Sequence, residues 1–71
     1  MRKHIDIEGM SCEHCAEAVR SVLEELGAVD ITVDYLAGYA NAEIDAEDDE
    51  IREKIADEGF DVEKIVDLHD E

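Results

Sequence analysis

The stretch GMSCEHC, residues 9–15, separates two segments whose apolar residues repeat with different periods. Before it, residues 3–8 alternate, with Ile5 and Ile7 on one side and polar residues on the other, which predicts a half-buried strand. After it, the apolar residues of 13–26 recur every three or four positions, which predicts an amphipathic helix. The stretch is therefore expected to form a loop between a strand and a helix, and it contains both cysteines of the chain.

The spacing of Cys12 and Cys15 brings two soft ligands to one place. With two residues between them, one thiolate lies in the loop and the other in the first helical turn, so both sulfurs can converge on one soft metal ion. Ser11 or Cys12 is the expected N-cap of the helix, and Gly27 is its expected end. We expect Cys15 to be the more acidic thiol, because a helix N-terminus favours its thiolate, and Cys12 to be the more exposed one.

Residues 29–35 alternate between apolar and polar side chains and predict a second strand. A turn at 36–38 joins it to a third strand at 39–44, so the two strands are expected to form a hairpin. Tyr35 and Tyr39 flank this turn, and we expect them to pack on each other.

A second, shorter helix is predicted after Asp48, its expected N-cap, and it ends at Gly59. Its expected buried side consists of Ile51, Ile55 and Ala56. Residues 62–68 predict a last strand, although the consecutive apolar pair Ile65-Val66 interrupts its alternation.

The order strand, helix, strand, strand, helix, strand is the split βαβ, or ferredoxin-like, arrangement, βαββαβ. It predicts an α+β fold with a four-stranded antiparallel sheet and two helices on one face. The loop at 9–15 and the loop at 59–60 would then lie at the same end of the molecule. Residues 1–71 are expected to form a single small domain.

The charge balance excludes several partners. With 22 acidic and 6 basic residues, the formal net charge is −16, which is unlike a nucleic-acid-binding surface or one that docks on anionic lipid. The acid is spread along a chain that keeps its apolar periodicity, which indicates a folded domain rather than a disordered acidic tail. Such a surface suits high salt, where repulsion is screened within about 3 Å at 1 M. A halophilic source is one hypothesis; a basic partner is the alternative.

The cysteine usage indicates the cytoplasm. The first nine residues lack the apolar centre of a secretory signal, and no apolar run reaches membrane-spanning length. A close pair of cysteines in a reducing compartment is typical of metal binding or redox chemistry, and not of a structural disulfide.

Residues 9–15, after a short strand and before a helix, resemble the metal loop of the heavy-metal-associated domain family, which includes soluble copper chaperones and N-terminal modules of copper-transporting P-type ATPases. The resemblance covers the whole chain in element order and length. Residues 59–62, GFDV, resemble the second loop of that family, beside the metal. Phe60 stands where tyrosine is common, which removes a hydroxyl that could donate toward a thiolate. The acidity is extreme for the family.

The resemblance implies a Cu(I) chaperone, and not an enzyme, with Cys12 and Cys15 as metal ligands and Met10 packing inward to support the loop. Cu(I) prefers thiolates and is held by few ligands, whereas Zn(II) normally takes four. The resemblance further implies that the metal is transferred by ligand exchange. A thiolate of the partner binds the ion, a three-coordinate bridge forms, and Cys12 or Cys15 then releases the ion.

The implied partner is the metal-binding domain of a copper-transporting P-type ATPase, or a metal-responsive regulator. A chain that begins at Met1 and stops after the fourth strand favours a stand-alone protein over a module of a pump. We expect a monomer without metal, and a copper-bridged dimer stays open for the loaded form.

Two other functions stay open. The same fold could carry zinc, cadmium or mercury, although family members that carry harder ions tend to place an acid directly before the first cysteine, where Ser11 stands here. Glu13 could still supply an oxygen ligand. The third hypothesis is a small dithiol oxidoreductase, which the lack of proline disfavours, because thioredoxin-like sites place a cis-proline opposite the dithiol.

The remaining candidates are interpreted as surface or packing residues. His14 is expected to point to solvent, His4 to lie on the outer face of the first strand, and His69 to lie in a frayed tail. Phe60 is expected either to pack in the core or to shield the metal. The acidic run 48–50 is interpreted as the first turn of a helix rather than as a hard-metal cluster.

Overall fold

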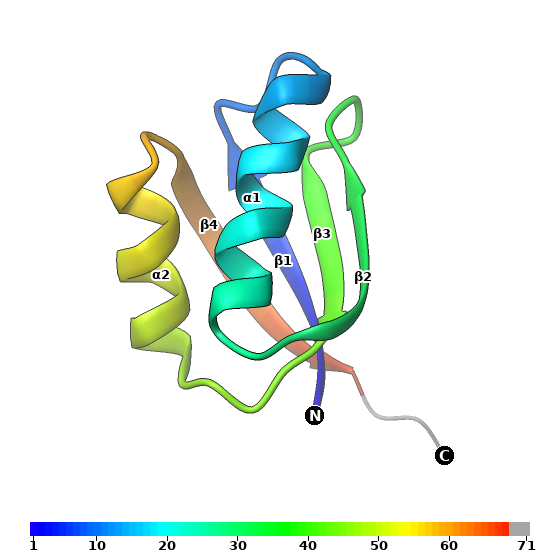
Figure 1. Cartoon of the computed structure of the whole chain (residues 1–71), viewed down its shortest axis with the longest axis vertical. Coiled ribbons are helices and arrows are strands. Elements are labelled where there is room, and N and C mark those ends of the chain that lie inside the picture. The colour runs from blue at the N-terminus through cyan, green and yellow to red at the C-terminus, as the bar shows by residue number, and fades with distance from the viewer. Residues whose placement is uncertain (69–71) are drawn as a thin grey trace.

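The computed structural model describes residues 1–68 and shows the predicted order of strands and helices (Figure 1). The elements are β1 (Arg2–Glu8), α1 (Glu13–Glu25), β2 (Val29–Asp34), β3 (Tyr39–Glu43), α2 (Asp48–Asp57) and β4 (Asp61–Leu68). The expectations for His69 and for a frayed tail lie outside the described residues.

The four strands form one antiparallel sheet in the order β2-β3-β1-β4, and both helices cover the same face of it (Figure 1). The predicted ferredoxin-like arrangement is therefore confirmed. Because β1 pairs with β3 on one side and β4 on the other, the loop that follows β1 leaves from the middle of the sheet.

The core lies between the sheet and the helices and follows the predicted periodicities. Ile5 and Ile7 of β1 are 0% and 4% exposed. The other apolar residues with exposures of 4% or less are Val19, Val22, Leu23, Ala40, Ala42, Ile44, Ile51 and Ile55. The expectation for Ala56 is wrong, since this residue is exposed. Ile51 and Ile55 lie one turn apart and form the narrow buried side of α2, and Ala56 is rotated away from it.

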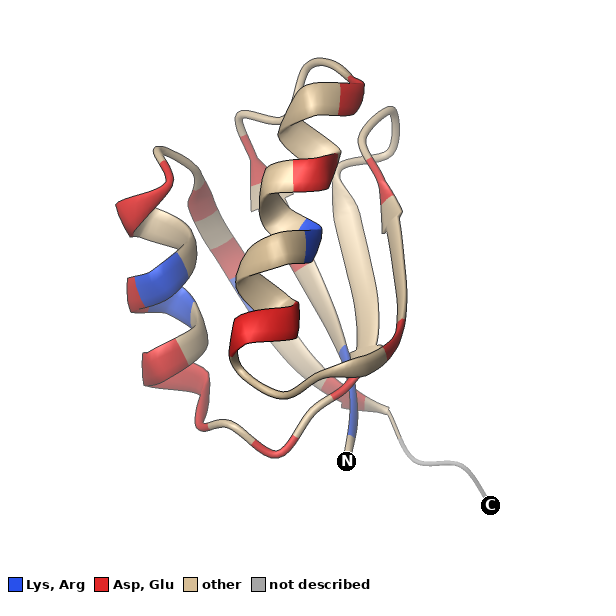
Figure 2. Ribbon diagram, in the orientation of Figure 1, with Lys and Arg blue, Asp and Glu red and all other residues tan. Residues whose placement is uncertain are grey.

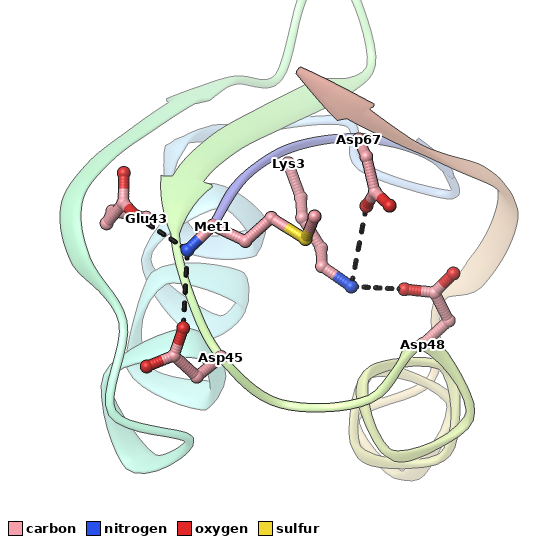
Figure 3. Close-up of polar contacts among 6 residues, drawn as sticks. All are labelled: Met1, Lys3, Glu43, Asp45, Asp48 and Asp67. Atoms are coloured by element: carbon pink, nitrogen blue, oxygen red, sulfur yellow. Dashed lines mark hydrogen bonds and ion pairs between the residues drawn. The ribbon is translucent and has the colours of Figure 1, made fainter. Parts of the chain in front are cut away.

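Lys3 is buried on the helix-facing side of β1, two residues before Ile5. Its Nζ donates to Asp48 Oδ1 at 2.6 Å and lies 3.6 Å from Asp67 Oδ1 (Figure 3). The hydrogen bond to Asp48 is the main reason that the pKa of Lys3 is raised. Asp48 is therefore not the predicted N-cap: α2 begins at Asp48, after Glu47, and the Asp48 carboxylate is bound by Lys3.

A bulge explains why the alternation of β4 is interrupted. The register between β1 and β4 shifts between Asp6 and Ile7, which leaves Glu63 as an extra residue on β4. Val62 and Ile65, three positions apart, can thus both pack against the core as partly buried residues.

The predicted packing of Tyr35 on Tyr39 is wrong. Tyr39 stacks on His4, with ring centroids 4.9 Å apart and an interplanar angle of 28°, whereas Tyr35 packs against the core. His4 lies on the outer face as predicted, but it is half-buried, and its ring nitrogens lie 2.7 Å from Asn41 Oδ1 and 3.0 Å from Asp6 Oδ1.

Hydrogen bonds hold the turn between β2 and β3 against the end of β1. The Gly38 N–H donates to the Asp34 carbonyl at 2.8 Å, and the Ala37 N–H donates to Asp34 Oδ1 at 3.0 Å. Gly38 has φ +81°, which glycine adopts without strain, and its carbonyl accepts from the Ile7 N–H at 2.8 Å. This turn is therefore fixed beside the loop that follows β1.

Acidic side chains lie on both helices and on all four strands (Figure 2). Repulsion from Glu8 is the main reason that the pKa of Glu63 is raised. At the end of the sheet opposite residues 9–15, the N-terminal amine lies 2.6 Å from Glu43 Oε2 and 3.2 Å from Asp45 Oδ1 (Figures 1 and 3). Within residues 1–68, neither helix combines the length and the apolarity needed to cross a membrane.

Candidate metal centre

Gly9 and Phe60 bring two loops together at one end of the molecule. Gly9 has φ +103°, and a Cβ at this position would lie 3.5 Å from Phe60 Cδ1 and 3.9 Å from Phe60 Cα. Since 3.5 Å is an ordinary contact distance, the positive φ, and not a lack of space, favours glycine here. The predicted proximity of the two loops is confirmed.

Met10 and Phe60 anchor these loops in the core. Each is 9% exposed, and both belong to the buried apolar cluster. Met10 thus packs inward, as the family resemblance implies. Phe60 is a core residue, while its other expected role, shielding a metal ion, stays a prediction.

Cys12 and Cys15 point their sulfurs toward each other across the start of α1. Cys12 is the exposed N-cap residue, with an extended backbone and no side-chain capping bond, and its carbonyl accepts from the Cys15 and Ala16 N–H groups at 3.1 and 3.2 Å. Cys15 is half-buried, and the two Sγ atoms lie 3.9 Å apart. Two bonds of about 2.3 Å, the length of a zinc–thiolate bond, span at most about 4.6 Å, so both sulfurs can reach one ion between them.

The pKa of Cys15 is lowered from its ordinary value, mainly because the backbone N–H of Ser11 donates to it. Partial burial opposes this effect, while contacts from Cys12 and from the Ser11 side chain add to it. The direction agrees with the expectation for Cys15. The helix N-terminus was the only cause expected from the sequence, whereas the largest contribution comes from the backbone of Ser11 in the preceding loop.

The other expected ligand candidates lie elsewhere or face solvent. His14 and Glu13 are exposed, and His4 is engaged by Asn41 and Asp6 on the outer face of the sheet. Among the side chains of residues 1–68, no group of three or more His, Cys, Asp or Glu is arranged to share a metal ion. The structure therefore brings the two thiols together, while their role as metal ligands stays a prediction.

Cys15 should react with iodoacetamide down to a lower pH in the folded protein than in the protein unfolded in urea. The thiolate is the nucleophile, and folding lowers the pKa of Cys15. Initial rates at Cys15, followed by mass spectrometry against pH in the reduced, metal-free protein, measure this difference. Because the pKa of Cys15 is lower in the folded than in the unfolded protein, its ionisation stabilises the fold. This contribution is fully present above the unfolded pKa and is lost as the pH falls through the folded pKa. Equal midpoints in both states would contradict the prediction.

Known proteins share this sequence pattern. The sequence profile of the family described as "Heavy-metal-associated domain" matches residues 4–61. A protein from Staphylococcus saprophyticus named copper chaperone CopZ is 40% identical over 63 residues, which cover 82% of this chain and 91% of that protein.

Solved structures share the fold as well. A structure described as CopZ metallochaperone superposes with a TM-score of 0.79 at 29% identity and covers 87% of this chain and 98% of its own. A copper binding domain from HMA7, a P-type ATPase, gives a TM-score of 0.81 at 28% identity, with 94% and 96% of the two chains covered.

Proposed function

Because the chain belongs to the heavy-metal-associated domain family, we propose that it carries Cu(I) on Cys12 and Cys15 and passes the ion to another protein. The relative named copper chaperone, which matches most of this chain, supports this function. In this proposal the protein is a carrier and not an enzyme, since it binds and releases the ion without converting a substrate into a product.

The observation that supports the choice of metal is the pair of sulfurs 3.9 Å apart, with no third side-chain ligand arranged beside them in residues 1–68. Cu(I) is a soft ion that prefers thiolates, whereas a structural Zn(II) site normally has four protein ligands. Two thiolates alone thus favour Cu(I) and leave the ion accessible to a further sulfur.

That accessibility provides a route for transfer. Cys12 is the exposed thiol, so we expect the incoming thiol of the partner to approach on its side. The incoming thiol releases its proton and binds the ion, which then has three sulfur ligands. The bond to Cys12 breaks first and the bond to Cys15 follows as the second partner thiol binds. Each departing thiolate then regains a proton from solvent.

The partner that we propose is the metal-binding domain of a copper-transporting P-type ATPase, or a metal-responsive regulator. A copper-binding ATPase domain has the same fold as this chain, so donor and acceptor would present similar loops. Both cysteines are free thiols, and a reducing compartment such as the cytoplasm would keep them so. We further propose that residues 1–71 act as one domain, monomeric without metal, with a copper-bridged dimer as the alternative when loaded.

Anaerobic titration of the reduced protein with Cu(I) against a competing chelator tests the proposed function, with Zn(II) titrated in parallel. We expect one Cu(I) to be bound tightly per chain, and Zn(II) to be bound much more weakly. Preferential retention of zinc, cadmium or mercury would assign another metal to this site. Failure to hold any metal would leave the dithiol oxidoreductase, for which the reduction potential of Cys12 and Cys15 is the decisive measurement.

We also propose that the charge of −16 is an adaptation to high salt. The melting temperature, followed by circular dichroism, should fall as KCl is lowered from about 1 M to about 0.01 M, because the range of repulsion grows from about 3 Å to about 30 Å. Glu63→Gln should reduce the salt dependence, since repulsion by Glu8 raises the pKa of Glu63. A melting temperature that is indifferent to salt would contradict the adaptation.

A further inference from the structure

Leu36 is an apolar side chain that the core does not use. It lies in the turn between β2 and β3 and is 86% exposed, more than any other large hydrophobic residue of 1–68. Turns favour Gly, Asn, Asp and Ser, and the positive φ of this turn falls on Gly38, so its geometry does not require leucine at position 36. Neither folding nor turn formation explains this residue.

A groove opens beside this turn, between α1 and β2. Its volume is about 310 Å³, and its lining consists of Glu13, Ala16, Glu17, Arg20, Val33 and Tyr35. Glu13 directly follows the exposed Cys12, and Tyr35 directly precedes Leu36. Figure 1 shows the first turn of α1 and the β2–β3 turn side by side at the same end of the molecule. The residues that line the groove therefore include the neighbours in sequence of both the exposed thiol and the exposed leucine.

The charge around the groove is negative. Arg20 lies 3.8 Å from Glu24 on the surface of α1. The carboxylates of Glu13 and Glu17 also line the groove, and neither forms an ion pair within residues 1–68. Arg20 is also the only Lys or Arg between positions 4 and 51 of the sequence. Figure 2 shows acidic residues in the first turns of α1 and at the end of β2, where the two elements approach each other.

We propose that Leu36 and this groove form the docking surface for the protein that exchanges Cu(I) with Cys12, an inference that rests on the proposed function. The surface fits a folded domain that presents an apolar side chain to Leu36 and surrounds it with Lys or Arg, which face Glu13 and Glu17. Buried apolar anchors slow dissociation, whereas complementary charges speed encounter. Docking at this surface places the dithiol of the partner next to the exposed Cys12.

A charge-reversed copy of this chain serves as a defined partner. The probe is the metal-free variant Glu13→Lys/Glu17→Lys, which retains both thiols and Leu36 and carries two lysines in place of the two glutamates of the groove; circular dichroism first checks that it is folded. We would titrate it into the ¹⁵N-labelled, Cu(I)-loaded protein at about 0.15 M KCl and follow amide shifts. We expect shifts at Ala16, Tyr35 and Leu36 as well as at Cys12, and weaker binding of an unaltered copy.

Variants of the labelled protein separate docking from general apolar contact. Leu36→Ser should weaken binding of the probe about tenfold, as expected for loss of one buried leucine. Val29→Ser is the matched control, because Val29 is 56% exposed at the end of β2 away from the turn that carries Leu36, and its replacement should leave binding unchanged.

Absence of binding, no effect of Leu36→Ser, or an equal loss in Val29→Ser would overturn the docking surface. Competition with a chelator measures the Cu(I) affinity of each variant, so a failure of docking can be told apart from a failure of Cu(I) binding. Leu36→Ser should hold Cu(I) as tightly as the unaltered protein, whereas failure of the unaltered protein to hold Cu(I) would reject the function itself.

Discussion

Cu(I) affinity should fall roughly a thousandfold or more in Cys12→Ser and in Cys15→Ser, because each variant loses one of two metal–thiolate bonds and a hydroxyl is a poor ligand for a soft ion. The two sulfurs lie 3.9 Å apart at the start of α1, and no other cysteine is present to replace either one. Competition with a Cu(I) chelator under anaerobic conditions measures the loss.

His14→Ala is the matched control for these variants. His14 lies between the two cysteines, but it is exposed, so its loss should leave Cu(I) affinity nearly unchanged. Retained affinity in either cysteine variant would show that the ligands are assigned wrongly. A large loss in His14→Ala would make the imidazole a third ligand.

Leu23→Ala should destabilise the fold by about 2–5 kcal/mol, the range for removing a buried leucine and leaving a cavity. Leu23 is 0% exposed and lies on the buried stripe of α1 that faces the sheet. A domain of this size has a total stability of only about 4–10 kcal/mol, so the variant should be close to unfolding. Urea titration followed by circular dichroism, in about 1 M KCl to screen the acidic groups, measures the difference.

Leu36→Ala provides the comparison, since the same side chain is removed from a site that is 86% exposed. Its effect should stay within about 0.5 kcal/mol, as for most surface substitutions. Similar losses in both leucine variants would mean that the core does not depend on the contacts of α1 with the sheet as the structure shows them.

Local pattern was sufficient to predict the elements and their order. The alternation of Ile5 and Ile7 and the stripe of Val19, Val22 and Leu23 each follow from the period of one element, and both sets are buried as predicted. Once the order of elements indicated the ferredoxin-like topology, the proximity of the Gly9 and Phe60 loops followed from it, and the structure confirms it.

Predictions from local pattern were wrong at Asp48 and Tyr39, where a residue distant in the sequence makes the contact. Asp48 is of a residue type that is favoured at N-caps, yet its carboxylate binds Lys3, 45 residues earlier in the chain. Tyr39 stacks on His4 from another strand rather than on its near neighbour Tyr35. In both cases a partner across the sheet or from a helix offered a closer contact than the sequence neighbour.

By itself, the sequence determined the βαββαβ order, the apolar faces of β1 and α1 and the pair of thiols at a strand–helix junction, because periodicity and spacing act over a few residues. Only the tertiary structure decided which charges are paired, where β4 bulges at Glu63, and that the backbone of Ser11 helps to lower the pKa of Cys15. It alone also showed that Leu36 is exposed and that a groove lies between α1 and β2, with Glu13 and Tyr35 in its lining. These features depend on strand register and on side chains that meet from separate elements, which no local period in the sequence encodes.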